Sequence, residues 1–279
     1  MTDPKPEDVI EANIQVHTRM ADSYNRNEPH YRPENRAKVR SKLEEMRRRF
    51  GSARLVDLGC GTGFVIDLAK DLFGAIDGVD VTQAMLDRVD LSSGNVRVHR
   101  CAAEALPFAD GSFDVVSAYA FIHHLKDYSK ALGEAFRVLK PGGGCYIDLE
   151  PNRLFWQAMV RLEQGAGGSR YSDIVLKEID AVLHRDKGVQ DEFGIDKETF
   201  NRAEYTKALL GGIDPWEFRD QCLRIGFRSC DISFEWFLGQ GAVMHQQSFE
   251  AAATVEAYLR RILPLSAECF KYLQFVLTK

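Results

Sequence analysis

Long apolar runs and a secretory leader are both missing from this sequence. No hydrophobic stretch approaches the roughly 20 residues that a bilayer-spanning helix needs. The first eight residues, MTDPKPED, are polar and acidic and do not resemble a signal peptide. Cysteine is also scarce, with six residues scattered along the chain and no C-x-x-C pair. We therefore expect a cytoplasmic protein with reduced, mostly buried thiols and no membrane partner.

An excess of basic residues is absent too. The 36 Lys and Arg residues are outnumbered by 41 Asp and Glu, which leaves a formal net charge of -5. Because binding to nucleic acid requires surplus Lys and Arg against the phosphates, nucleic acid is not expected as the main partner. The one basic cluster, residues 36–49, has helical spacing and is interrupted by Glu44 and Glu45. It is typical of a solvated helix face, with a phosphate-binding patch as the alternative.

The clearest motif is the stretch LVDLGCGTG at residues 55–63. Its apolar start predicts a strand, its three alternate glycines a tight loop, and the residues that follow a helix. The spacing G-x-G-x-G differs from the G-x-G-x-x-G of dinucleotide folds. Asp57, at the end of the strand, suits a cationic amine better than a pyrophosphate, which it would repel. The stretch predicts a loop that holds a cationic ligand, and the alternative is an ordinary glycine-rich turn.

Strand-like and helix-like segments alternate after residue 50. This alternation predicts an α/β fold with a doubly wound, mostly parallel sheet and helices on both faces. In such sheets a ligand binds beyond the carboxyl ends of the strands, where the strand order reverses. The expected strands are 54–58, 75–80, 95–100, 113–119, 145–149, 226–236 and 270–278, and the expected core helices are 63–73, 83–89, 128–139, 215–225 and 248–262.

Residues 55–63 closely resemble the first motif of the class I S-adenosylmethionine (SAM) dependent methyltransferases. GVDVT at 78–82, CAAEALPF at 101–108 and EAFRVLKPGG at 134–143 are similar to later motifs of that family. The resemblance implies SAM as the cofactor and S-adenosylhomocysteine (SAH) as its product. It also implies a seven-stranded sheet that closes with a hairpin-like pair near the C-terminus.

The resemblance divides the chain into regions. It is strong over residues 50–150, weak over 214–279 and nearly absent elsewhere. The regions that we predict are a SAM-binding core made of residues 51–150 and 213–279, an N-terminal helical lid over residues 1–50, and a helical insert over residues 151–212 above the acceptor site.

By resemblance, an acid at the end of the second strand accepts hydrogen bonds from the ribose hydroxyls, and apolar residues after it pack on the adenine. The family's usual Asp after the third strand is Ala102 here, so the adenine amino group loses a carboxylate acceptor. Its recognition is expected to pass to the backbone near Ala103, to Glu104 or to water. The residues predicted to contact the cofactor are Tyr24, Asp57, Gly59, Cys60, Gly61, Gly63, Asp80, Val81, Met85, Ala103, Glu104 and Tyr119.

By resemblance to the family, the N-terminal segment is expected to fold over the cofactor as a lid. Residues 21–25, ADSYN, are similar to the A-x-x-Y-D entry common in the family, with Asn25 in place of the acid. By that resemblance Tyr24 reaches the cofactor. The alternative is that Tyr24 and Tyr31 only anchor the helices on the domain surface.

Two adjacent histidines, His123 and His124, follow the fourth strand in a loop that should face the sulfonium. One of them is expected to act as a general base on the acceptor or to orient it. The alternative is that one histidine packs and forms hydrogen bonds beneath the loop. We predict no metal site, because neighbouring side chains diverge and no third ligand has suitable spacing.

These features favour transfer of a methyl group to an O, N or C atom of a small-molecule acceptor by in-line displacement. The acceptor pocket is expected between the lid, the loop 121–124 and the insert, with Phe155, Trp156 and Tyr171 as candidates for its apolar wall. A protein or RNA methyltransferase and a catalytically silent SAM-binding protein are the alternatives. The sequence leaves open the acceptor, the methylated atom and the oligomeric state.

Overall fold

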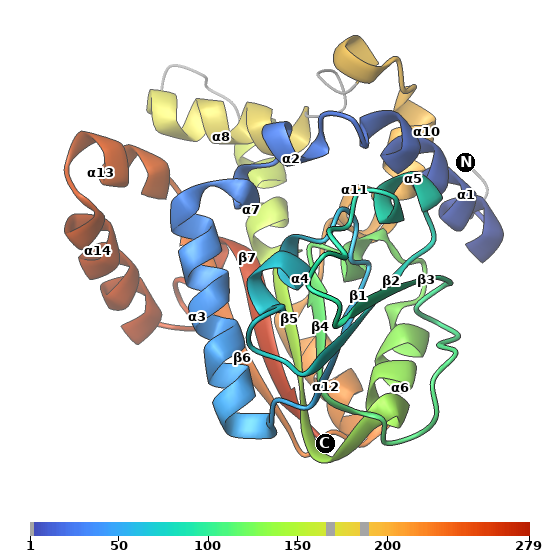
Figure 1. The fold of residues 1–279 in the computed structure, drawn as a ribbon. Coiled ribbons are helices and arrows are strands. Elements are labelled where there is room, and N and C mark those ends of the chain that lie inside the picture. The colour runs from blue at the N-terminus through green and yellow to red at the C-terminus, as the bar shows by residue number, and fades with distance from the viewer. Residues whose placement is uncertain (1–2, 166–170, 185–189) are drawn as a thin grey trace.

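The computed structural model describes residues 3–165, 171–184 and 190–279. Within these residues seven strands form one sheet that has helices on both faces, which confirms the expected α/β fold (Figure 1). The strands are β1 (Arg54–Leu58), β2 (Ala75–Asp80), β3 (Val96–Arg100), β4 (Phe113–Tyr119), β5 (Leu139–Pro151), β6 (Ser229–Phe237) and β7 (Phe270–Thr278).

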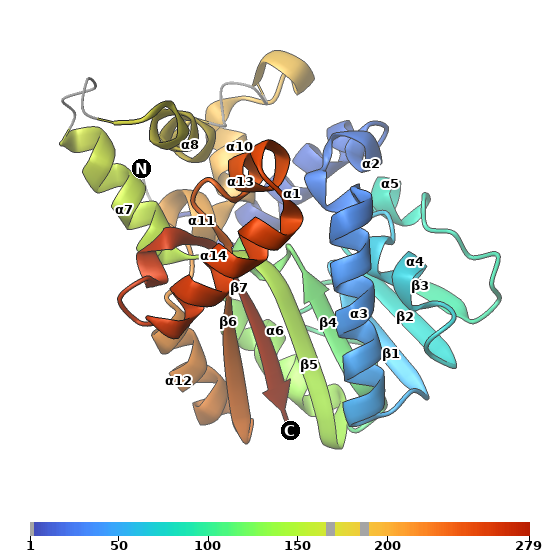
Figure 2. The same ribbon diagram turned by 90° about the vertical axis from the view of Figure 1, so that its left-hand side faces the viewer.

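The helices form two groups, one packed along the sheet and one that lies beyond the carboxyl ends of its parallel strands or, for residues 249–261, beside β6 (Figures 1 and 2). The first group is α3 (Pro33–Phe50), α4 (Phe64–Ala69), α5 (Gln83–Leu86), α6 (Tyr128–Val138) and α12 (Pro215–Ile225). The others are α1 (Pro6–Met20), α2 (Tyr24–Asn27), α7 (Arg153–Gln164), α8 (Asp173–Leu183), α10 (Lys197–Ala203), α11 (Tyr205–Leu210), α13 (Gln240–Gln246) and α14 (Phe249–Arg261). Short 3₁₀ helices span Pro29–Tyr31, Ile122–His124 and Ala267–Cys269.

The strand order creates a binding edge. Along the sheet the order is β3-β2-β1-β4-β5-β7-β6. Strands β1 to β5 are parallel, and β7 lies antiparallel between β5 and β6. The chain proceeds outward from β1 to β3 and then crosses to β4 on the other side of β1. Because the order reverses between β1 and β4, their carboxyl ends border the crevice where such sheets bind ligands.

Successive residues of the central strands enter two separate cores. Leu55 of β1 and Val115 of β4 pack on the face covered by α3 and α4. Their neighbours Val56 and Val116 pack on the opposite face, under α6 and α12. Both sets are fully buried because helices cover both faces, as expected for a mostly parallel sheet (Figures 1 and 2).

The lid and the insert pack against each other over the carboxyl edge of the sheet. Val16 and Met20 of α1 form one apolar cluster with Phe200 and Ala203 of α10. Figure 1 shows α1, α2, α8 and α10 together above that edge. Segments nearly two hundred residues apart therefore form a common roof over the crevice.

Several elements differ in extent from the sequence expectations. Helix α6 ends before the Lys-Pro-Gly-Gly segment as expected, but β5 begins directly at Leu139, which pairs with Phe113 beside a bulge. Helices α4 and α5 are shorter than predicted, and α7 and α13 were not expected. Asn152 caps α7 by accepting a hydrogen bond from the amide of Leu154. Phe155 and Met159 lie one helical turn apart on the buried side of α7.

In the parts of the chain that the structure describes, every helix is too short or too polar to cross a bilayer.

Helix α3 belongs to the core although it lies within the segment expected to form a lid. Its Leu43 is fully buried against the sheet. We expect Leu43→Ala to lower the free energy of unfolding by about 2–5 kcal/mol, because it leaves a cavity in a packed core. Urea unfolding followed by circular dichroism measures this change.

Leu223→Ala on α12 is the matched control, since the side chain of Leu223 is 40% exposed. It should change the free energy of unfolding by no more than about 0.5 kcal/mol. Equal effects of the two substitutions would contradict the placement of α3 in the core.

Candidate functional site

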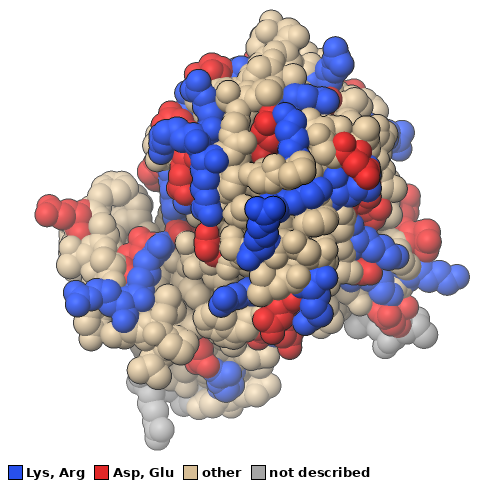
Figure 3. All heavy atoms as spheres, turned by 90° about the horizontal axis from the view of Figure 1, so that it is seen from below, with Lys and Arg blue, Asp and Glu red and all other residues tan. Residues whose placement is uncertain are grey.

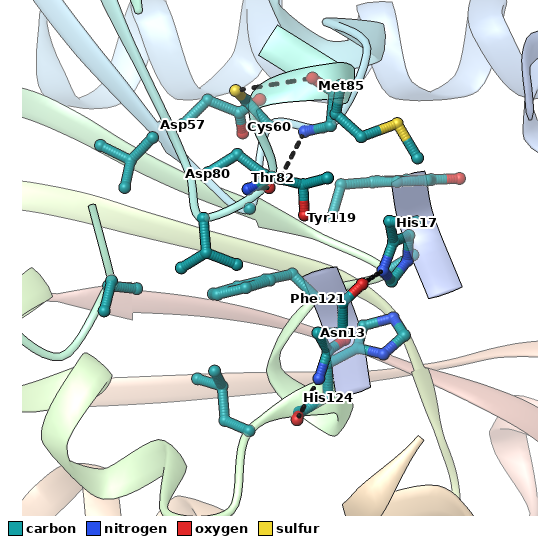
Figure 4. Close-up of a pocket in the computed structure, with 18 of the residues that line it drawn as sticks. Asn13, His17, Asp57, Cys60, Asp80, Thr82, Met85, Tyr119, Phe121 and His124 are labelled. Atoms are coloured by element: carbon teal, nitrogen blue, oxygen red, sulfur yellow. Dashed lines mark hydrogen bonds between the residues drawn. The ribbon is translucent and has the colours of Figure 1, made fainter. Parts of the chain in front are cut away.

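A cavity of about 200 Å³ lies at the carboxyl ends of β1, β2 and β4. In Figure 4 Asp57, Asp80 and Met85 lie toward one end of it and His124 toward the other. Gly63 is not among its lining residues: it is the N-cap of α4, and its Cα faces Val89. The predicted cofactor residues that line the cavity are Tyr24, Asp57, Gly59, Cys60, Gly61, Asp80, Val81, Met85, Ala103, Glu104 and Tyr119.

The glycine loop has a backbone conformation that only glycine adopts without strain. Gly59 and Gly61 have φ angles of 64° and 52°. A Cβ atom on Gly59 would overlap the ring of Phe121, which follows β4. The amide of Gly61 donates a hydrogen bond of 3.0 Å to Oδ2 of Asp80. The loop is therefore held between the ends of β2 and β4.

Asp80 ends β2 and borders the cavity. Besides the Gly61 amide, it accepts a 2.8 Å hydrogen bond from the amide of Thr82 on its other oxygen, Oδ1. Each carboxylate oxygen retains a further lone pair, so the group can still accept hydrogen bonds from a ligand. Thr82 is at the N-cap position of α5 as predicted, but its side chain makes no capping hydrogen bond.

Asp57 is a buried acid at the end of β1, with only 2% of its surface exposed. Burial raises the pKa of its carboxyl to about 7, and the nearby negative charge of Asp80 adds to the rise. The hydroxyl of Ser117 on β4 donates a 2.6 Å hydrogen bond to Asp57 and opposes that rise. The cavity thus contains a carboxyl group that ionises near neutral pH, and no cation lowers its pKa.

Another part of the cavity wall combines apolar side chains with an acid. Val81, Met85 and residues 101–104 all line the cavity. Ala102 is among these, so no carboxylate is present at the position where the family has an Asp. Burial raises the pKa of Glu104, the acid two residues later that also lines the cavity.

The N-terminal segment is attached to the glycine loop through Thr62. The Thr62 hydroxyl donates to Oδ1 of Asn25 at 2.6 Å, and the hydroxyl of Tyr31 lies 2.6 Å from the same Thr62 oxygen. Because Thr62 donates to Asn25, Tyr31 is the donor to Thr62. Tyr24 and Tyr31 both line the cavity, and burial raises the pKa of both phenols, which therefore stay neutral.

A second, larger cavity of about 820 Å³ adjoins the first. Its wall comes from the lid, from α8 and α10 of the insert, and from α13. The sequence did not predict α13, which places residues 240–242 and 244–246 in this wall. The residues that line both cavities are His17, Tyr24, His30, Tyr119, Ala120 and His124.

His123 is fixed by a buried carboxylate. Its Nδ1 lies 2.8 Å from Oε2 of Glu150, which is fully buried at the end of β5. Glu150 also accepts hydrogen bonds from the backbone amides of Phe121, Ile122 and His123. The Nε2 atom of His123 lies 3.8 Å from Glu204, and both residues line the second cavity. One carboxylate therefore sets both the course of the loop and the orientation of the imidazole.

His124 lies beside His123 instead of pointing away from it. Their ring centroids are 4.2 Å apart, and Nδ1 of His124 lies 2.9 Å from the carbonyl oxygen of Ala203. Burial, followed by the neighbouring His123, lowers the pKa of His124 well below its usual value. Glu204 lies within reach of both rings. The expectation that the two neighbouring side chains diverge is therefore wrong, and a third potential ligand, Glu204, comes from a remote part of the sequence.

The three predicted wall residues have different surroundings. Phe155 lines the second cavity, whereas Trp156 and Tyr171 line neither cavity. Trp156 packs in the cluster of α7 and α8, so its side chain contributes to the core.

Sequence reasoning missed several polar residues of the site. Ser117 lies inside β4 among apolar residues, where a buried polar residue is unusual, and that pattern was a usable signal; Glu150 is buried at the end of β5. The other residues became apparent only in the fold, because their partners are remote in the sequence. These are His17, His30, Thr62 and Glu204.

Comparison with known proteins identifies the central domain. A family model described as a methyltransferase domain matches residues 56–147. A demethylmenaquinone methyltransferase of Chlorobaculum parvum is 37% identical over 99 residues, which are 35% of this chain and 41% of that protein. The 27-O-demethylrifamycin SV methyltransferase of Amycolatopsis mediterranei is 30% identical over 166 residues, covering 56% of this chain and 60% of that protein. The chain therefore matches 41% and 60% of the lengths of these two relatives.

Solved structures share the fold. A phosphoethanolamine N-methyltransferase 2 from Haemonchus contortus, in complex with SAH, aligns with a TM-score of 0.55 and 16% identity. That alignment covers 100% of this chain and 61% of the other. The matched domain contains the glycine loop, Asp80 and the loop after β4, all of which border the first cavity. Residues 56–147 are therefore a methyltransferase domain, and the chain has the fold of SAM-dependent methyltransferases.

Proposed function

We propose that the protein transfers the methyl group of SAM to an O, N or C atom of a small-molecule acceptor. The observation that carries this proposal is the junction of two cavities, which share Tyr24, Tyr119 and His124 in their walls. In-line displacement requires the acceptor atom, the methyl carbon and the sulfur to be aligned across such a junction. Two relatives are named for small molecules, demethylmenaquinone and demethylrifamycin, which supports this acceptor class.

The first cavity is the proposed SAM site. The glycine loop and Asp57 hold the methionine end, where the carboxylate of Asp57 balances the positive charge of the cofactor. Asp80 accepts hydrogen bonds from the ribose, and Val81 and Met85 pack on the adenine. Glu104 supplies the carboxylate acceptor for the adenine amino group that Ala102 cannot supply.

The second cavity is the proposed acceptor site. Its volume lies within the roughly 300–1,000 Å³ that is typical of small-molecule pockets. Aromatic side chains from separate elements, among them Phe155, Phe200 and Trp236, supply apolar surface. His123, oriented by Glu150, and His124 are the polar groups that bind the acceptor near the transferred methyl group.

A macromolecular acceptor has less support. The basic cluster of residues 36–49 lies on α3, where Arg40 pairs with Asp71, Lys42 with Glu45 and Lys38 with Glu235. On the face opposite the roof, acidic and basic side chains are interspersed (Figure 3). Neither feature provides the uncompensated positive surface that RNA requires. The six unpaired thiols accord with activity in a reducing compartment such as the cytoplasm.

Calorimetric titration with SAH tests the cofactor site. We expect one SAH per chain, and we expect Asp80→Ala to weaken binding roughly 10- to 100-fold, because hydrogen bonds to both ribose hydroxyls are lost. Asp87→Ala is the matched control, since Asp87 follows α5 and lies outside both cavities. Absence of SAH binding by the unmodified protein would refute the cofactor assignment.

A screen of metabolites with labelled SAM then tests the catalytic proposal. Label transfer to a small molecule by the unmodified protein, and loss of transfer in Asp80→Ala, is the expected result. Normal SAH binding without transfer to any small molecule, in a cell extract or a metabolite library, would favour a silent SAM-binding protein.

The ionisation of Asp57 predicts how stability depends on pH. Its pKa is about 7 in the fold and about 3.9 in an unfolded chain, so the folded state binds more protons between these values. The free energy of unfolding should therefore fall as pH rises from about 4 to above 7. Asp57→Asn removes this loss, so above pH 7 the variant should be more stable than the unmodified protein by on the order of 4 kcal/mol.

Denaturant unfolding at pH 5 and pH 8, without ligand, measures this difference. The stability advantage of Asp57→Asn should be on the order of 1.5 kcal/mol at pH 5 and on the order of 4 kcal/mol at pH 8. SAH affinity should change in the opposite sense: it increases from pH 6 to pH 8 in the unmodified protein and is weak at both values in Asp57→Asn. A pH-independent stability difference would show that Asp57 does not titrate in this range.

A further inference from the structure

Three side chains with metal-binding groups converge where the two cavities meet. His123 and His124 come from the loop after β4, and Glu204 lies between α10 and α11, about eighty residues later. One ligand atom from each of the three lies within 4.8 Å of the others. The fold thus brings the carboxylate of Glu204 to two imidazoles that are adjacent to each other but remote from it in the sequence.

Both imidazoles are oriented through their Nδ1 atoms. Nδ1 of His123 lies 2.8 Å from the carboxylate of Glu150, and Nδ1 of His124 lies 2.9 Å from the carbonyl oxygen of Ala203. Since each of these acceptors requires a hydrogen on Nδ1, the Nε2 atoms of both rings are left as acceptors. Metal-binding histidines in proteins are commonly fixed in this way by a carboxylate or a backbone carbonyl.

The spacing lies close to that of a metal site. Ligands of a transition metal lie about 2.0–2.2 Å from the ion, so two of them can be at most about 4.4 Å apart. Nε2 of His123 is 3.8 Å from Oε2 of Glu204, which is within this limit. The largest separation in the group, up to 4.8 Å, requires a shift of a few tenths of an ångström in one side chain.

The charges nearby include one competing cation. The ammonium of Lys207 forms an ion pair with Glu204, and both residues line the second cavity. The buried carboxylate of Glu150 lies behind His123 and adds a second negative charge. Two carboxylates against one ammonium leave this corner of the cavity favourable to a further cation.

We propose that His123, His124 and Glu204 bind one divalent transition-metal ion facing the acceptor cavity. Two histidines and one carboxylate are a ligand set known for such ions, which accept imidazole nitrogen more readily than Mg²⁺ or Ca²⁺ do. The site lies at the boundary with the SAM cavity, because His124 lines both. An ion here is positioned to hold an oxygen atom of the acceptor next to the methyl group.

This inference rests on the proposed function in naming the acceptor class: a molecule with an ionisable oxygen, such as a phenol or an enol. Binding to the ion lowers the pKa of that hydroxyl, and its proton leaves to solvent. The resulting anion attacks the methyl carbon with its oxygen atom. An enolate, whose charge is shared with carbon, can instead attack with its α-carbon. The bond from methyl carbon to sulfur breaks, and the sulfur keeps the electron pair as neutral SAH. His123 then acts as a ligand and not as the proton acceptor.

Metal titration of the SAM-free protein tests the site without reference to activity. Protein dialysed against EDTA is titrated with Co²⁺ and with Zn²⁺ by calorimetry, and visible absorption reports the coordination of Co²⁺. We expect one ion per chain, and we expect Glu204→Gln and His124→Ala each to weaken binding at least about tenfold, because losing even an outer partner of a ligand costs roughly 10- to 100-fold. Melting temperatures establish that each variant is folded.

His184→Ala is the matched histidine control, since His184 pairs with Glu163 and lines neither cavity. It should keep the affinity of the unmodified protein for both ions. No binding of Co²⁺ or Zn²⁺, or binding that Glu204→Gln and His124→Ala both retain, would overturn the metal site. If the folded EDTA-treated protein binds SAH but no metal, this inference fails while the proposed SAM site stands. If it binds metal but no SAH, the metal site stands, while the proposed SAM site and the acceptor class that depends on it fail.

Discussion

The buried carboxylate of Glu150 is the interaction on which the rest of the site depends. A fully buried negative charge is unfavourable unless hydrogen bonds compensate it, and here three consecutive backbone amides and the ring of His123 do so. These bonds fix the loop after β4. The loop in turn sets Phe121 against Gly59 and brings His124 to the boundary of both cavities. The same group therefore shapes the cofactor side and the acceptor side.

The two cavities are built in different ways. The first lies on the sheet itself, where the ends of β1, β2 and β4 position short loops with little freedom. The second is enclosed by helices from the N-terminal segment, the insert and α13, which meet only through tertiary packing. Thr62 connects the two parts, because its hydroxyl binds Asn25 and Tyr31 of the lid from within the glycine loop. The position of the N-terminal segment and the shape of the glycine loop are thus physically linked.

Much of the core could be predicted from sequence because its signals are local. Alternating strands and helices gave the sheet, and Asp57, Gly59, Gly61 and Asp80 were found from one motif and the strand after it. The extents of β5, α4 and α5 were less accurate, since pairing and packing decide where an element ends. Gly63 was assigned to the cofactor by pattern alone, yet in the structure it is the N-cap residue of α4 and does not line the first cavity.

The sequence by itself determined the fold class and the position of the donor site, because short-range periodicity and glycine spacing specify strands, loops and their carboxyl ends. Only the tertiary structure decided how the rings of His123 and His124 are arranged. Adjacent side chains were expected to diverge, but Glu150 and Ala203 hold both rings on one side, and Glu204 joins them from a distant helix end. Contacts between remote segments leave no periodic trace in a sequence, so the second cavity was visible only in the folded chain.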